Sequence, residues 1–268
     1  MTQRFLVPPN KPVSLADHDP GYTGDYESKG ETKAELKRNG KRLRDLQEVL
    51  WAENKHALLI VLQALDAGGK DGTIKHVMHG VNPQGCRVTS FKVPTDAELE
   101  HDYLWRVHKA TPRRGDIGIF NRSHYEDVLV VRVHNLVPES VWQQRYEQIN
   151  NFEKLLADSG TTIVKFFLHI SKEEQKERFE ARLRDPRKNW KFSMGDVKER
   201  GYWDDYMRAY EDALSRCSTP WAPWYVIPAD HKWYRNLAIS EIIIETLERL
   251  DMRFPPPLPD AGEIVIPD

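Results

Sequence analysis

Five short apolar runs recur along the chain, and the segments between them are long enough and periodic enough to form helices. The first run, ALLIVLQAL at 57–65, contains β-branched residues and leads into a glycine-rich turn, which is typical of a strand buried on both faces. Strands that alternate with helices form parallel sheets with helices on both sides. The sequence therefore predicts an α/β protein with five parallel strands, which we expect at 57–65, 86–93, 115–121, 161–170 and 224–229.

Several of the expected helices carry signals in their first turn. The sequence T-K-A-E from Thr32 reads as a capping box and predicts a helix that runs to about Asn54. Further boxes begin at Thr95 and Ser171, and Pro138 suits the first turn of another helix. These local signals agree with the alternation of strands and helices.

The charge balance limits the possible partners. The 268 residues include 39 Lys and Arg against 41 Asp and Glu, a net charge of −2. A chain without an overall basic field is not expected to bind nucleic acid or membranes, so a site for a polyanion has to be local. Cys86 and Cys217 suggest neither a disulfide framework nor a zinc site. With no apolar run near 18 residues and no leader-like start, we expect a cytoplasmic protein.

The chain reads as one domain between two irregular ends. Residues 1–31 are rich in Pro, Gly, Asp and Ser without a period, which predicts an extended arm on the surface or against a partner subunit. Residues 32–254 contain all of the expected strands and helices and form the single domain. The remaining residues, 255–268, begin with a run of prolines and are expected to be a loose tail.

A candidate phosphate loop, A-L-D-A-G-G-K-D-G-T, follows the first expected strand. Gly68 and Gly69 allow the backbone amides to approach a phosphate, Lys70 adds a positive charge, and the next helix points its positive end at the anion. The pattern departs from G-x-x-x-x-G-K-[ST], because Ala64 replaces the first glycine and Asp71 the hydroxyl residue. By this motif alone, a plain glycine-rich turn stays open as the alternative.

A second polar group, F-N-R-S-H-Y-E-D-V, follows the third expected strand. In a doubly wound sheet, ligands bind beyond the carboxyl ends of the strands, so both groups are expected to converge on one crevice. Carboxylate oxygens are the ligands that Mg²⁺ prefers, and no histidine cluster suggests a softer metal. The expected crevice residues are Asp66, Lys70, Asn121, Arg122, Glu126 and Asp127. Asp66, Glu126 and Asp127 are the candidate metal ligands, with at most one of Glu126 and Asp127 expected to bind the metal.

Each of these assignments has a structural alternative. Arg122 could bond loop carbonyls, and Glu126 and Asp127 could be acids favoured by a helix dipole. The chain has no G-x-S-x-G, and its glycines lack the G-x-G-x-x-G order of dinucleotide-binding proteins. Serine-nucleophile chemistry and dinucleotide binding are therefore not supported.

A basic run extends from Arg178 to Lys191, with six basic and two acidic residues in fourteen positions. The Asp-Pro step inside it is expected to interrupt a helix. The run is a candidate for a lid that closes over phosphates, with a solvated helix face as the alternative.

Four ordered motifs together resemble the polyphosphate kinase 2 family. They are D-A-G-G-K-D-G-T, S-F-K-V-P-T, F-N-R-S-H-Y-E-D-V-L-V and D-P-x-K-x-W-K, and the similarity extends from about Leu43 to about Leu250. The resemblance implies a P-loop kinase-like three-layer α/β/α sandwich with a helical basic lid at about 178–200. It also implies phosphoryl transfer between inorganic polyphosphate and adenine or guanine nucleotides, with Mg²⁺ or alternatively Mn²⁺, in a homodimer or homotetramer.

The resemblance assigns roles to particular residues. Asp66 and Asp127 match the family's phosphate-loop and Walker B-like aspartates, and Lys70 and Arg122 match its phosphate-binding cations. These four are the expected catalytic residues. The Y-E-D-V-L-V continuation looks like the class III branch, whose members phosphorylate both AMP and ADP. The expected phosphate and polyphosphate contacts are Gly68, Gly69, Lys70, Asp71, Gly72, Thr73, Lys75, Lys92, Arg113, Arg122, Arg178, Arg182, Lys188 and Lys191.

Two other functions stay open. An ATP-dependent nucleoside monophosphate kinase would have the same loop and lid, and a non-catalytic polyphosphate- or nucleotide-binding regulator would keep the cations without needing the acids. The presence of Asp66, Glu126 and Asp127 counts against the regulator. The aromatic residues could include one that stacks on a base, although core or subunit contacts are the more common role of such side chains. They are Trp190, Trp203, Tyr206, Tyr210, Trp221, Trp224 and Trp233.

Overall fold

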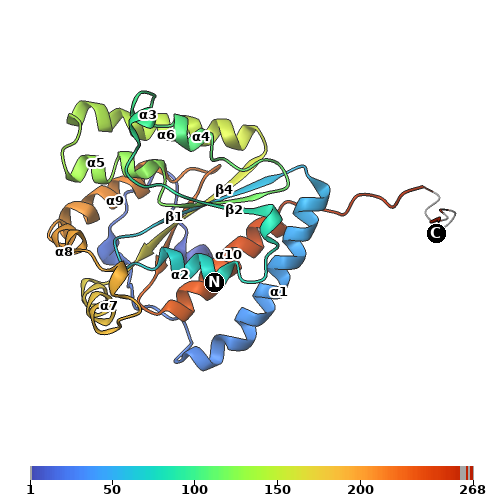
Figure 1. Ribbon diagram of the computed structural model, residues 1–268, viewed down its shortest axis with the longest axis horizontal. Coiled ribbons are helices and arrows are strands. Elements are labelled where there is room, and N and C mark those ends of the chain that lie inside the picture. Colours follow the sequence, from blue (N-terminus) through green and yellow to red (C-terminus); the bar gives the residue numbers. More distant parts are fainter. Residues whose placement is uncertain (1, 260–263, 265, 268) are drawn as a thin grey trace.

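The computed structural model describes residues 2–259, 264, 266 and 267. Its centre is one sheet of five parallel strands in the order β2-β3-β1-β4-β5 (Figure 1). The expected α/β class and the all-parallel sheet are confirmed. The strands are β1 Ala57–Gln63, β2 Cys86–Ser90, β3 Ile117–Asn121, β4 Thr161–His169 and β5 Trp224–Pro228.

Helices cover both faces of the sheet and complete the three layers (Figure 1). One face packs against α1 Lys29–Glu53, α2 Lys70–Val77 and α10 Lys232–Glu248. The other face packs mainly against α6 Glu139–Asp158 and α9 Trp203–Cys217. The remaining α-helices are α3 Asp96–Leu99, α4 Trp105–His108, α5 Val130–Val133, α7 Lys172–Arg184 and α8 Met194–Arg200. Short 3-10 helices lie at Thr2–Phe5, Leu15–Asp17, Pro83–Gly85, His124–Asp127 and Asn189–Lys191.

Three of the predicted helix starts can be compared with the structure. The box at Thr95 is present, with its hydroxyl and the Glu98 carboxylate each bonded to the other residue's backbone N–H. The box at Ser171 is half formed: its hydroxyl accepts from the amide of Glu174, but that carboxylate pairs with Arg178. Pro138 lies one residue before α6 rather than inside its first turn.

The predicted start of α1 at Thr32 is wrong. The helix begins at Lys29 after Ser28, whose hydroxyl donates to the Glu31 carboxylate. Thr32 is buried in the first turn, where its hydroxyl donates to the carbonyl of Lys29. A buried threonine bonded inside the helix is not available as a cap.

The amino-terminal segment is packed into the domain. Phe5, Val7 and Leu15 are buried, and Leu6 forms an antiparallel bridge with Tyr225 of β5. The segment is irregular, as expected, but it covers the outer edge of β5, which would otherwise offer unpaired backbone groups. It is therefore a part of the core rather than an arm lying only on the surface.

At the other end, residues 253–259 are exposed and lie outside any helix or strand. Of the expected tail at 255–268, residues 260–263, 265 and 268 lie outside the described residues. Among the residues that the structure describes, no helix is both long and apolar enough to cross a membrane.

Candidate phosphate-transfer site

The loop between β1 and α2 needs both of its glycines. Gly69 precedes the first turn of α2 with φ 103°, a left-handed conformation that favours glycine. At Gly68, a Cβ atom would lie 2.5 Å from the Cβ of Ala64 and 2.9 Å from the carbonyl oxygen of Leu65. The loop is thus a tight strand-to-helix turn that leads into the positive end of α2.

Lys70 lies across this turn. Its Nζ donates to the carbonyl of Ala64 at 2.7 Å. Ala64 directly follows β1, which ends at Gln63 and not at the expected residue 65. Burial, with the neighbouring Arg122 charge, lowers the pKa of Lys70 to about 8. Desolvation and a nearby like charge both disfavour the ammonium form, whereas a bound anion would favour it.

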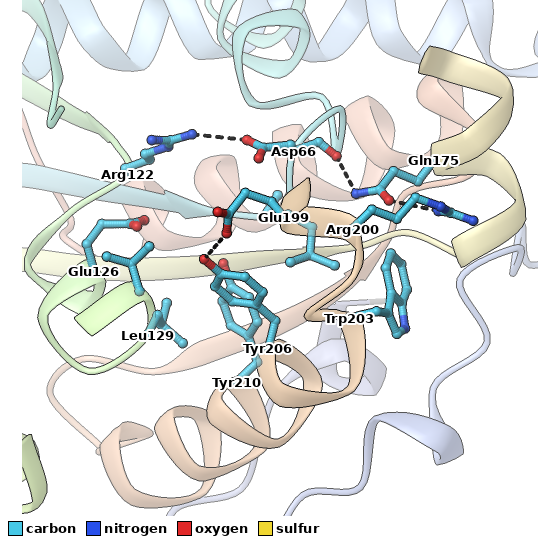
Figure 2. Close-up of a pocket in the computed structure, with 13 residues that line it drawn as sticks. Asp66, Arg122, Glu126, Leu129, Gln175, Glu199, Arg200, Trp203, Tyr206 and Tyr210 are labelled. Atoms are coloured by element: carbon cyan, nitrogen blue, oxygen red, sulfur yellow. Dashed lines mark hydrogen bonds and ion pairs between the residues drawn. The ribbon is translucent and has the colours of Figure 1, made fainter. Parts of the chain in front are cut away.

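Arg122 reaches the loop from the carboxyl end of β3. Its Nη2 donates to Asp66 at 3.0 Å, so the two side chains bridge β3 and the loop after β1 (Figure 2). Although burial alone would lower it, the pKa of Arg122 is raised by the carboxylates of Glu126 and Asp66. Arg122 has φ 62°, a strained conformation for a residue with a side chain. Such strain is often found where a site requires one orientation.

A cavity of about 240 Å³ opens beside this pair. Asp66, Arg122 and Glu126 all line it, so three of the expected crevice residues do share one space (Figure 2). Glu126 is fixed by Gln63 of β1, whose amide donates to its carboxylate at 3.1 Å. The rest of the cavity wall includes Leu129, Val130, Gln175, Glu199, Arg200, Trp203, Tyr206 and Tyr210.

Helix α9 supplies the aromatic part of that wall. Trp203, Tyr206 and Tyr210 are three and four positions apart, a spacing that puts them on one face of a helix (Figure 2). This spacing is the feature of the sequence that indicates that the three side chains line the same surface. Tyr206 donates to Glu199 at 2.8 Å, which ties α9 to α8 across the cavity wall.

Asp127 does not lie with Asp66 and Glu126. Its carboxylate accepts from Arg145 at 3.0 Å and lines a different cavity, of about 440 Å³, with Arg106. Burial raises the pKa of Asp127 to about 6, although both arginines oppose this. The expectation that Asp127 converges on one crevice with Asp66 and Glu126 is therefore wrong, and of the two neighbouring acids only Glu126 shares a cavity with Asp66.

The reason is local geometry. Glu126 and Asp127 are neighbours in the 3-10 helix at His124–Asp127. With three residues per turn, successive side chains of such a helix differ by about 120° in direction. One carboxylate therefore faces Asp66, and the next one faces away from it.

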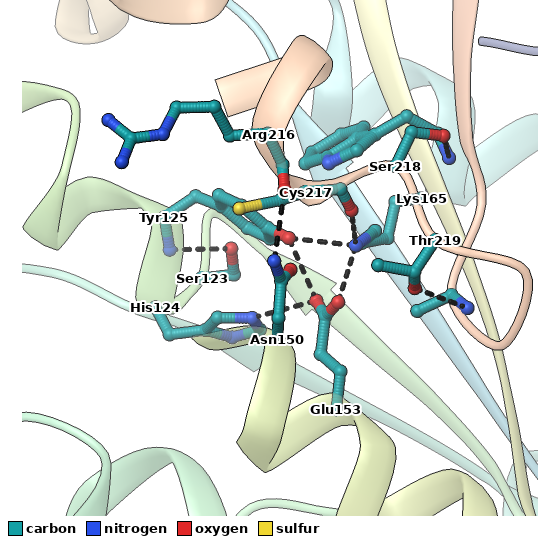
Figure 3. A network of polar contacts seen from close by, with 12 residues as sticks. Ser123, His124, Tyr125, Asn150, Glu153, Lys165, Arg216, Cys217, Ser218 and Thr219 are labelled. Atoms are coloured by element: carbon teal, nitrogen blue, oxygen red, sulfur yellow. Dashed lines mark hydrogen bonds and ion pairs between the residues drawn. The ribbon is translucent and has the colours of Figure 1, made fainter. Parts of the chain in front are cut away.

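A buried polar network holds this short helix in place (Figure 3). His124 and Tyr125 both contact the carboxylate of Glu153 on α6, at 3.1 and 3.0 Å. Lys165 of β4 donates to the same carboxylate and to the Tyr125 hydroxyl. Glu153 and Lys165 are both fully buried. The turn that carries Glu126 is thus fixed to the sheet and to α6.

The basic run forms the second half of α7 and the 3-10 helix at Asn189–Lys191, and α8 follows it. Helix α7 ends just before the Asp-Pro step, as expected. Lys191 approaches Asp71, with 3.6 Å between Nζ and the carboxylate, so this segment lies beside the phosphate loop. Arg182 faces Asp196 at 3.5 Å, and Lys188 pairs with Asp185.

Arg178 does not reach outward with the rest of the run. It is buried, and it donates to Glu174 and to four main-chain carbonyls, those of Ala67, Gly68, Ala229 and Asp230. These contacts use all five N–H donors of a guanidinium. The expectation that Arg178 closes over polyphosphate is therefore corrected: it holds the phosphate loop against the loop after β5.

The remaining expected phosphate contacts differ in how accessible they are. Lys75 and Lys92 are exposed, and Gly72 lies in the first turn of α2. The hydroxyl of Thr73 is buried and donates to the carbonyl of Gly69. Arg113 precedes β3 and pairs with Asp116, so it lies at the amino end of the strand whose carboxyl end carries Arg122. Arg113 is thus not part of the phosphate loop, and its contact with a longer polyphosphate chain stays a prediction.

Comparison with known proteins agrees with this architecture. The family model for Polyphosphate kinase 2 (PPK2) matches residues 26–255. An AMP/ADP-polyphosphate phosphotransferase of Meiothermus ruber is 56% identical over 98% of this chain and 99% of its own, and an ADP-polyphosphate phosphotransferase of Rhodopseudomonas palustris is 49% identical over 96% and 93%. A crystal structure of polyphosphate kinase 2 from Arthrobacter aurescens TC1 has a TM-score of 0.91 and 46% identity, covering 94% of this chain and 90% of that one. The chain therefore belongs to the polyphosphate kinase 2 family.

Proposed function

We propose that the chain is a polyphosphate-dependent nucleotide kinase that converts ADP to ATP and AMP to ADP, reversibly. The observation that carries the proposal is that Arg122 of β3 and Asp66 of the phosphate loop pair at the edge of one cavity, beside Lys70. The choice of substrates is supported by the relative from Meiothermus ruber, an AMP/ADP-polyphosphate phosphotransferase that is 56% identical over almost the whole chain.

The proposed reaction exchanges one phosphorus–oxygen bond for another. A terminal oxygen of the ADP β-phosphate bonds to the terminal phosphorus of polyphosphate, and the bond to the next phosphate breaks, which gives ATP and a chain one unit shorter. The attacking oxygen is already anionic, so no strong general base is needed. Positioning and charge stabilisation remain as the tasks of the protein.

Each residue at the loop then has a role. The amides at the start of α2 and the charges of Lys70 and Arg122 would offset the charge on the transferred oxygens. Asp66 would orient Arg122 through the bond at 3.0 Å. The exposed lysines of the basic run, Lys188 and Lys191, would contact the rest of the polyphosphate chain beside the loop.

The donor set also fits a magnesium ion. Asp66 and Glu126 present two carboxylates to one cavity, and Mg²⁺ is usually bound by one or two carboxylates together with substrate phosphates. These two residues would hold the ion, and Mn²⁺ would suit the same oxygens. When bound, the ion would supply charge neutralisation at the phosphates.

The test is a nucleotide assay with purified protein, Mg²⁺ and long-chain polyphosphate, in which AMP and ADP are offered separately and the products are resolved by chromatography. We expect ADP from AMP and ATP from ADP. Lys70→Ala should lose both activities, whereas Lys41→Ala, which changes an exposed lysine of α1, should keep them. Phosphorylation of AMP with ATP as the donor, and none with polyphosphate, would instead identify an ordinary nucleoside monophosphate kinase.

We also propose that the chain forms a homodimer or homotetramer, as the family resemblance implies. Light scattering coupled to size-exclusion chromatography measures this mass directly. A single species at the monomer mass of 31.2 kDa would contradict the proposal.

A further inference from the structure

The phosphate loop has a buried arginine behind it that the sequence motifs do not include. Arg235 lies in the first turn of α10 and is only 2% exposed. Its guanidinium lies against Gly69: a Cβ atom at that position would be 2.0 Å from Nη1 of Arg235. A Cβ atom at Gly72, in the first turn of α2, would be 3.6 Å from Nη2. Arg235 therefore adjoins the backbone of the loop on the side turned toward α10.

This guanidinium has few partners. Its Nε and Nη2 donate to the side-chain oxygen of the neighbouring Asn236, a neutral group. Its Nη1 is buried and has no hydrogen-bond partner among the described residues. An unpartnered polar atom at such a depth costs free energy, so a fold that retains one usually has a reason for it.

The charge of Arg235 also lacks a counter-charge. Burial, together with repulsion from Arg178, lowers its pKa to about 9. Lys232, one turn earlier on α10, has its pKa lowered by burial and by the same two arginines. The carboxylate of Glu174 is bonded to Arg178, not to Arg235. The protein thus holds an excess of positive charge directly behind the phosphate loop.

We infer that Arg235 is a positioning residue of the phosphate loop, whose buried charge is balanced by the phosphates that the loop binds. This inference rests on the proposed function, since it takes polyphosphate as the anion. Arg235 acts through the loop backbone and through its field, because its burial behind Gly69 keeps it from direct contact. In low-dielectric surroundings, such a field is weakly screened.

The charge of Arg235 could serve the binding of a ligand or the stability of the fold. These two roles predict opposite effects on stability and on anion affinity when the charge is removed. If the charge serves the ligand, its removal leaves the free protein as stable as before or more stable, and it weakens anion binding. If Arg235 only supports the fold, its removal lowers the stability and leaves anion binding unchanged. Stability and affinity measured together therefore separate the two roles.

The experiment compares wild type, Arg235→Met and Asn236→Asp. The first variant removes the charge at similar volume, and the second neutralises it by placing a carboxylate where Asn236 now accepts from the guanidinium. Arg249→Met, at the exposed carboxyl end of α10, is the matched control. For each protein, the melting temperature is measured with and without inorganic tripolyphosphate, and the Kd values for tripolyphosphate and for ADP are measured by calorimetry.

We expect both variants to melt at or above the wild-type temperature without tripolyphosphate, and to be stabilised less by it. Their Kd should rise by about tenfold, which corresponds to about 1.4 kcal/mol. Arg249→Met should match wild type. Should Arg235→Met fail to fold, Asn236→Asp, which replaces only the amide nitrogen by oxygen, gives the same comparison.

Two outcomes would overturn the inference, and they are distinguishable. If wild type binds tripolyphosphate and Asn236→Asp binds it equally well, Arg235 has no role in anion binding, while the proposed function stands. If wild type binds ADP but no tripolyphosphate, polyphosphate is not the substrate and both proposals fail.

Discussion

At the scale of single residues, the site depends on which side chain faces which cavity. Asp66 and Glu126 share the cavity beside Arg122, whereas Asp127 is bonded to Arg145 in another one. The motif F-N-R-S-H-Y-E-D-V contains both Glu126 and Asp127, and it does not show which of the two faces Asp66. Their directions follow from the turn that carries them.

Substitution of the two aspartates tests this assignment. Asp66→Asn should lower kcat for ADP phosphorylation by about 100-fold, the typical loss when one group that stabilises transition-state charge is removed. Asp127→Asn should keep kcat within a few-fold of wild type, because Asp127 lies outside that cavity. The kinetics are measured at saturating Mg²⁺ and polyphosphate. A loss in Asp127→Asn as large as in Asp66→Asn would restore the role that the motif alone suggests.

The lowered pKa of Lys70 predicts a limit at alkaline pH. The ammonium loses its proton as the pH rises through about 8, so the cation that we propose binds phosphate is present below this pH and absent above it. We expect kcat/KM for polyphosphate to fall about tenfold per pH unit above that value. Lys70→Arg keeps its charge at any accessible pH, so its profile should stay flat to higher pH. A wild-type profile that is flat to pH 10 would contradict the role of Lys70.

At the scale of secondary-structure elements, the 3-10 helix at His124–Asp127 is too short to be stable by itself, and polar contacts with its neighbours hold it in place. Glu153 of α6 and Lys165 of β4 form a fully buried ion pair beneath it. Removal of one partner leaves the other as an uncompensated buried charge, while removal of both avoids that cost. The pair therefore links α6, β4 and the helix that carries Glu126.

Variants of this pair should show strong coupling. Lys165→Met should lower the free energy of unfolding by about 3–5 kcal/mol, as expected when one partner of a buried ion pair is lost. The double variant Glu153→Gln/Lys165→Met should be less destabilised than the sum of the two single variants. Urea denaturation measures all three, with Lys154→Met, which changes an exposed lysine of α6, as the control. Additive effects would show that the two side chains act independently.

At the scale of the whole molecule, the two ends of the chain's folded part meet. Val7 donates to the carbonyl of Trp224 at 2.9 Å, and its own carbonyl accepts from the Ser218 hydroxyl. Phe5 packs with Tyr234 of α10, at 6.3 Å between ring centroids. The amino-terminal segment is thus joined to β5 and to α10.

Truncation of these buried side chains should destabilise the domain. Phe5→Ala should cost about 3–5 kcal/mol, the usual range for a buried phenylalanine. Val93→Ala, at a side chain that is 88% exposed, should change the stability by less than about 0.5 kcal/mol. Thermal or urea unfolding of both variants checks this. An unchanged midpoint for Phe5→Ala would mean that the segment contributes little to the core.

The sequence predicts those features that are encoded locally. Strand β1 could be predicted because its run is almost entirely apolar, as its full burial requires. The phosphate loop could be predicted because its glycines and Lys70 are contiguous. The roles of Arg145 and Arg235 could not be predicted, because each arises from a contact with a residue far away in the sequence. Arg145 contacts Asp127, and Arg235 lies against Gly69. The direction of the Asp127 side chain is set by a short 3-10 helix. Such a helix is too short to give a repeating pattern in the sequence, so this direction could not be predicted.

The bridge between Leu6 and Tyr225 also has a consequence for synthesis on the ribosome. Leu6 leaves the exit tunnel long before Tyr225, and it can occupy its final position only after residue 225 has followed it. Until then, β5 is incomplete and Phe5 and Val7 have no surface to cover. The nascent chain must therefore carry these apolar side chains through most of translation, so an incomplete product ending before β5 would expose them together with the unpaired edge of β4.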